Sequence, residues 1–193
     1  MTEEELLKIA EPLISDNKWN AWSVIRELRQ IPVGELENLI LLITATETRL
    51  VPDTLWNARY VIDALKDVPA GEREALVRLI TAPETRLVRD NKENAHYVIW
   101  SLSKVPVAER EALVRLILEP VTRLVTENLS NAHYVIMDLS KVPVAEREAL
   151  VRLILEPETR LVRDDLENAS NVIGVFMDFP ADKREAFAKK YLK

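Results

Sequence analysis

A repeat of 37 residues governs what this chain can fold into. The dipeptide Asn-Ala begins at positions 20, 57, 94, 131 and 168, and proline recurs at 32, 69, 106, 143 and 180. Three further prolines, at 83, 120 and 157, keep the same interval. We therefore expect a single domain over residues 1–193. It would comprise a half repeat 1–19, full repeats 20–56, 57–93, 94–130 and 131–167, and a capping repeat 168–193.

Each repeat predicts two helices. Only three glycines occur in 193 residues, and no Asn-Gly or Asp-Gly turn is present, whereas Ala, Leu, Glu and Arg are abundant. We expect the acidic residues at 16, 53, 90, 127 and 164 to cap the first helix. The recurring proline suits the first turn of the second helix, because it has no N–H to donate. A linker such as EPETRLVRD would hold a short helical turn. The predicted fold class is all-α.

The helical period assigns a buried face to each predicted helix. In the third repeat, the stripe of the first helix is Ala95, Val98, Ile99 and Leu102. The matching stripe of the second helix is Ala112, Leu113, Leu116 and Ile117. One repeat cannot bury such faces alone, but stacked neighbours can. This predicts a right-handed α-solenoid, with the handedness taken from its resemblance to HEAT and tetratricopeptide arrays.

The outward faces of the two helices differ in character. The second helices carry Glu and Arg at i and i+4, as in Glu111 and Arg115, which is typical of a solvated outer wall. The first helices instead carry large aromatic residues pointing away from their core stripe, the residue types enriched at interfaces. The predicted apolar anchors are Trp56, Tyr60, Tyr97, Trp100, Tyr134 and Met137. The predicted specificity residues are Arg26, Arg59, Asp63, Lys104 and Asp138.

Repeats three and four are identical at 30 of 37 positions, and the differences are clustered. Trp100 becomes Met137 and Ser101 becomes Asp138, on or beside the outward ridge of the first helix. Four more changes fall at the start of that helix and one in the linker. This pattern indicates a constant scaffold with a varying binding surface, although free drift of solvent-facing positions after a recent duplication is the alternative.

Two recurrences favour structural roles. The first is a ladder of amides that would satisfy backbone groups of neighbouring loops. Its members are Asn20, Asn57, Asn94, Asn131 and Asn168. The alternative is that these amides grip the backbone of an extended peptide, as in armadillo-type solenoids. The second is Thr-Arg-Leu-Val, whose arginine lies four residues before the acidic cap, so that Arg86 would pair with Asp90.

No constellation for catalysis, metal or cofactor binding is found in the sequence. There is no cysteine, and His96 and His133 lack further ligands for zinc. The net charge of −6 argues against a nucleic-acid partner. It also weighs against a HEAT-like DNA-repair enzyme built on Trp100 or Trp56 with Asp63. No apolar run approaches the roughly 18 residues of a membrane span, and no cleavable signal peptide begins the chain. We expect a cytoplasmic protein, or one secreted without such a peptide.

The repeat unit, approximately PLI-DN-x-x-NA-x-x-VI-x-x-L-x-x-(I/V)P-x-x-ERE-x-LV-x-L, resembles tandem helical repeats in large proteins of intracellular bacteria. The resemblance covers nearly the whole chain and implies a non-enzymatic interaction protein with a protein or peptide partner. An engineered or purely structural repeat protein without a ligand is the alternative. We expect a monomer or a weak homo-oligomer.

Overall fold

The computed structural model describes residues 2–14, 18–48, 50–51, 58–85, 87–88, 95–119, 124, 131–155 and 169–191. Within these ranges the chain forms eleven α-helices and no strand, so the all-α prediction is confirmed. The helices fall into two compact units, residues 1–103 and 104–193, and each unit is described by itself.

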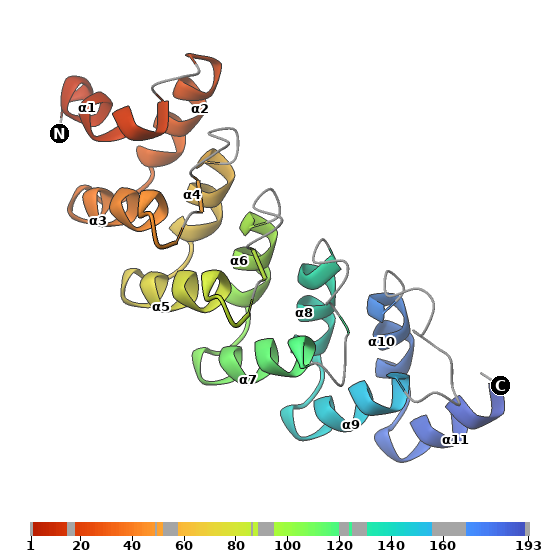
Figure 1. Ribbon diagram of the computed structural model, residues 1–193. Helices are drawn as coiled ribbons and strands as arrows, with labels where there is room; N and C mark the ends of the chain where they lie inside the picture. The colour runs from red at the N-terminus through yellow and green to blue at the C-terminus, as the bar shows by residue number, and fades with distance from the viewer. Residues whose placement is uncertain are drawn as a thin grey trace. The chain divides into compact units, whose positions relative to one another are not determined.

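The first unit contains six helices arranged as two rows (Figure 1). They are α1 (Glu3–Ile14), α2 (Lys18–Leu28), α3 (Val33–Thr44), α4 (Ala58–Lys66), α5 (Ala70–Thr81) and α6 (Ala95–Ser103). The first helices of successive repeats, α2, α4 and α6, pack against one another in order, and α1, α3 and α5 do the same. Within this unit, each helix therefore contacts its equivalent in a neighbouring repeat.

The second unit contains the remaining five helices. They are α7 (Val107–Leu118), α8 (Ala132–Lys141), α9 (Val144–Leu155), α10 (Ala169–Met177) and α11 (Ala181–Tyr191). Here α8 packs on α7 and α10, and α9 packs on α10 and α11. The same relation between equivalent helices is thus present in this unit.

Two kinds of helix start are visible in the described residues. Thr2 and Glu5 form a reciprocal capping box: the Glu5 backbone N–H donates to Thr2 Oγ1 over 3.2 Å, and the Thr2 N–H donates to Glu5 Oε2 over 2.7 Å. Each recurring proline directly precedes a second helix, and the Pro106 carbonyl accepts the N–H of Glu109 at 2.9 Å. The acidic residues predicted to cap the first helices lie outside the described residues.

The linkers after α3 and α5, whose turns the structure describes, hold turns of the expected kind. The Thr85 N–H donates to the Ala82 carbonyl, and its hydroxyl donates to the carbonyls of Leu79 and Ala82 at 2.8 and 3.0 Å. Leu87 and Val88 are buried beside this turn. In this linker and at 48–51, the threonine, leucine and valine of the Thr-Arg-Leu-Val recurrence therefore serve the fold. The predicted pair of Arg86 with Asp90 lies outside the described residues.

The predicted core face of the first helices is confirmed, and that of the second helices is partly wrong. All four residues of the α6 stripe have at most 1% of their surface exposed. In α7, Ala112 is exposed and Leu116 is half-buried, although Leu113 and Ile117 are buried as expected. The buried side of α7 is Arg110, Leu113, Val114 and Ile117, so the true stripe is rotated toward an arginine.

An equivalent buried arginine is present in α5, α7, α9 and α11, and it is the main structural element that the sequence analysis missed. The contacts of Arg147 in α9 show its role. Arg147 of α9 is 6% exposed, and its Nε donates to the Val142 carbonyl at 2.9 Å while Nη2 donates to the Ser140 carbonyl at 3.3 Å. Its Nη2 also lies 2.9 Å from the Glu109 carboxylate of the previous repeat. One guanidinium therefore joins the end of α8, the turn before α9 and the first turn of α7.

The same arrangement recurs elsewhere in each unit. Arg73 donates to the carbonyls of Leu65 and Val68 and pairs with Glu35 at 2.7 Å. Arg184 pairs with Glu146 at 2.7 Å. We call this recurring set, an arginine with the carboxylate 38 residues before it, the arginine staple. The signal in the sequence was the middle arginine of Glu-Arg-Glu, which a hydropathy pattern assigns to solvent.

Candidate partner-binding face

Three large aromatic residues lie on exposed surfaces of α4 and α6 in the first unit. Tyr60, Tyr97 and Trp100 are 39%, 47% and 46% exposed, whereas Val98 and Ile99 on the other side of α6 are buried. The 3.6-residue period explains this separation, because residues three or four apart, such as Tyr97 and Trp100, project from the same side. We call Tyr60, Tyr97 and Trp100 the aromatic face.

Histidine links the rings of this face. The His96 ring stacks on Tyr60 of the neighbouring helix with centroids 5.0 Å apart and lies 3.9 Å from the Tyr97 ring. His96 is therefore part of a ring stack that bridges α4 and α6. The aromatic face is consequently held by neighbouring side chains on one edge and open to solvent on the other.

Two arginines lie over aromatic rings at the same set of helices. The Arg59 guanidinium lies 4.1 Å from the Tyr60 ring centroid and also donates to its hydroxyl. The Arg26 guanidinium lies 5.4 Å from the ring of Trp22, which is 67% exposed. Trp22 was missed as a candidate, although it occupies the repeat position of Arg59 and His96, which could have revealed it.

Charged residues predicted to set specificity are already engaged in a network between α2 and α4. Arg26 pairs with the buried Glu27 at 2.8 Å, and Lys66 reaches the same carboxylate at 3.4 Å. Lys66 also forms an ion pair with Asp63, and its ammonium group donates a hydrogen bond to Gln30 Oε1 at 2.9 Å. Arg26 and Asp63 remain about half exposed and could still meet a partner.

This network raises the pKa of Lys66 above its ordinary value of 10.5, chiefly through the hydrogen bond to Asp63 and against the opposing effect of burial. A group whose pKa is raised in the folded state contributes its full stabilisation at pH values below its pKa in the unfolded state. This stabilisation is lost as the pH rises through its pKa in the folded state. We therefore expect the stability difference between wild type and Lys66→Gln to shrink above about pH 10.5. Urea unfolding of both proteins from neutral pH upward measures it, and a difference that does not change with pH would contradict this assignment.

In the second unit, the predicted residues are divided between surface and interior. Tyr134 is 48% exposed and its ring lies 3.8 Å from His133, Lys104 is exposed, and Met137 is half-buried. Asp138, expected among the specificity residues, is only 9% exposed. Its carboxylate accepts from Ser170 of α10 and pairs with Lys141 at 2.8 Å.

The burial of Asp138 corrects the interpretation of one repeat difference. A residue next to the outward ridge is turned by about 100° toward the neighbouring first helix, so it packs between helices rather than facing solvent. Ser101, its counterpart in α6, is 1% exposed. The Ser101-to-Asp138 change therefore alters packing between helices.

The asparagine ladder is described at one position only. Asn131 directly precedes α8, is half-buried, and its side chain makes no capping hydrogen bond. The side chain of Asn20 and the residues Asn57, Asn94, Asn168 and Trp56 lie outside what the structure describes. Both interpretations of the ladder stay predictions.

Among the described residues, no three or more histidine, cysteine or acidic side chains are grouped so that they could hold a metal ion. In the described stretches, none of the helices is both long and apolar enough to cross a membrane. Comparison with protein-family models, curated protein sequences and solved structures finds no match.

Proposed function

We propose that the chain is a right-handed α-solenoid of 37-residue repeats that binds a protein or peptide partner through its first helices, without catalysis. The observation that carries this proposal is the aromatic face, whose three large rings are 39–47% exposed on helices with fully buried opposite sides. Exposed aromatic clusters on a soluble domain usually mark contact sites. The resemblance to interaction repeats of intracellular bacteria supports the same proposal.

The stacked rings suit such a role energetically. Tyr97 is already in contact with His96, so little side-chain entropy remains to be lost when a partner covers it. Arg59 and Asp63 border the rings and supply hydrogen bonds and charge for orientation. The partner would therefore place apolar groups on the rings and polar groups at their edge.

The exposure of Trp100 is the first measurable consequence. With Trp19, Trp22 and Trp56 replaced by phenylalanine, the remaining Trp100 should fluoresce at long wavelength and be readily quenched by acrylamide. The reason is that about half of its side-chain surface faces water, at 46% exposed. Blue-shifted, protected emission would indicate that Trp100 is packing surface and would remove the main support for the proposal.

Peptide selection tests binding itself. Peptides selected on the wild-type protein from a random displayed library should lose at least about tenfold in affinity for the double variant Tyr97→Ala, Trp100→Ala. The matched control is Arg115→Ala on the outer wall, which should bind them unchanged. Selection that yields no binder, or peptides that bind the double variant equally well, would favour a purely structural or engineered scaffold.

A further inference from the structure

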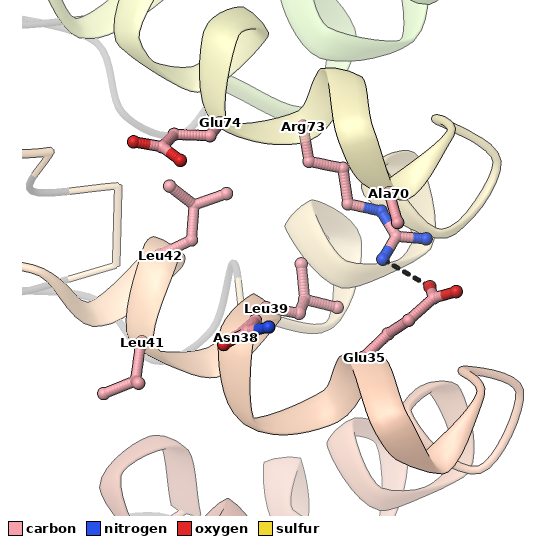
Figure 2. A pocket seen from close by; sticks show the side chains of 8 residues that line it. All are labelled: Glu35, Asn38, Leu39, Leu41, Leu42, Ala70, Arg73 and Glu74. Carbon is pink, nitrogen blue, oxygen red and sulfur yellow. Dashed lines mark hydrogen bonds and ion pairs between the residues drawn. The ribbon is translucent and has the colours of Figure 1, made fainter.

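A second surface, separate from the aromatic face, lies between α3 and α5 (Figure 2). It is a hollow of about 490 Å³, within the usual range for ligand pockets. Its lining residues are Glu35, Asn38, Leu39, Leu41, Leu42, Ala70, Arg73 and Glu74. In Figure 2, Leu42 and Glu74 point toward one another from the two helices. We call this surface the α3 groove.

The α3 groove coincides with a local departure from the repeat. At the position of Leu41, the other second helices carry a cation: Arg78, Arg115, Arg152 and Lys189. At the position of Asn38 they all carry alanine. Both departures line the groove, although they leave α3 as regular a helix as α5. The fold therefore does not require them.

The exchange at position 41 uncovers apolar surface. In α5, Arg78 pairs with Glu74 at 2.7 Å one turn earlier, and α7 and α9 hold the equivalent pairs. In α3, Leu41 stands there instead and is 60% exposed. A large aliphatic side chain with that exposure, next to the half-buried Leu42, offers an apolar anchor point where the other second helices carry a cation.

The same exchange leaves a negative charge without its usual neighbour. Glu37, one turn before Leu41, forms no ion pair within the part of the chain that the structure describes, whereas its counterparts Glu74, Glu111 and Glu148 all do. The two carboxylates that line the groove are already paired, Glu35 with Arg73 and Glu74 with Arg78. The exposed Glu37 is therefore the carboxylate beside the apolar centre that a partner's cation would meet.

From these observations we infer that the α3 groove is a docking site for a basic amphipathic helix or peptide from another protein. Its apolar side chains would cover Leu41 and Leu42, and a lysine or arginine would pair with Glu37 in place of the arginine that α3 lacks. An apolar centre with complementary charge at its edge gives both affinity and orientation. This site uses second helices and does not depend on the aromatic face.

A labelled probe peptide of leucine, lysine and alanine, with its leucines on one helical face, tests the site by fluorescence anisotropy. We expect wild type to bind it and Leu41→Arg, which recreates the pair of the other repeats, to weaken binding at least about tenfold. Glu37→Gln should weaken it less and reduce its salt dependence. Ala112→Arg, an exposed site on α7 with the same charge change, is the control and should bind within about twofold of wild type.

Each other outcome overturns the proposal. No binding of the probe by wild type would show that the groove is not such a site. Equal losses in Leu41→Arg and Ala112→Arg would reduce the interaction to general charge attraction. Self-association of wild type that Leu41→Arg abolishes, measured by sedimentation, would make a second copy of the chain the occupant. Circular dichroism of each variant checks that the helices are retained.

Discussion

Replacing Arg147 by alanine is expected to lower the free energy of unfolding by about 2–4 kcal/mol. The substitution removes the donors of the Ser140 and Val142 carbonyls and the cation beside Glu109, all in a site where the arginine side chain is 7% exposed. Buried carbonyls without donors and a half-buried carboxylate without its cation both destabilise the folded state. Urea unfolding followed by circular dichroism gives the difference.

The chain supplies matched controls for this prediction. Arg152→Ala breaks an exposed pair with Glu148 on the same helix and should cost less than about 1 kcal/mol. Arg147→Leu copies α3, where the equivalent residue Leu36 is fully buried, and should cost less than alanine because it fills the space. Equal stability of Arg147→Ala and Arg152→Ala would show that the arginine staple contributes nothing beyond a surface ion pair.

Replacing Phe176 by alanine is expected to cost about 3–5 kcal/mol. Phe176 is 1% exposed and meets Phe187 of α11 edge-on, with centroids 5.9 Å apart. Phe187 in turn lies 4.2 Å from Phe179, so the aromatic cluster joins α10 to α11. Removal of one ring leaves a cavity among rigid neighbours that cannot close around it.

Leucine is the control at this position, because Leu65, Leu102 and Leu139 occupy it in the other repeats. Phe176→Leu keeps an apolar side chain of similar reach and should cost only about 1 kcal/mol. The urea midpoints of the two variants and of wild type give these differences in stability. An alanine variant as stable as the leucine variant would mean that α10 and α11 are held together mainly by other contacts, such as the hydrogen bond from Arg184 Nε to the Phe176 carbonyl at 2.9 Å.

The core stripe of the first helices was predictable from the sequence, because its residues, such as Val98, Ile99 and Leu102 in α6, are apolar and follow the helical period. The second helices were not, since their buried face includes Arg110 and its equivalents. A hydropathy pattern treats arginine as a solvent-facing residue. Whether a guanidinium is buried depends on acceptors brought to it by other segments, here the carbonyls at the end of the preceding helix, and only the structure shows them.

The candidate face divides in the same way. The exposure of Tyr97 and Trp100 follows from helical geometry alone, although their role stays a prediction. The surroundings of charged side chains do not follow from geometry, as Asp138 shows: its place between α8 and α10 depends on the residue of the next repeat, Ser170. The groove beside Leu41 was overlooked because it arises where α3 lacks the arginine or lysine that the other second helices carry at this position.

The arginine staple also determines how such a chain can change its length. Arg147 meets Glu109 and Arg184 meets Glu146, and both pairs are separated by 38 residues. Excision of residues 110–146 would place Arg184 at that same separation from Glu109, with an identical local sequence around it. Loss or gain of a whole repeat therefore leaves each staple arginine with a glutamate 38 residues before it. An insertion of a few residues would change that separation and leave a buried arginine without its carboxylate. Recombination between the near-identical copies is tolerated by the fold only in units of 37.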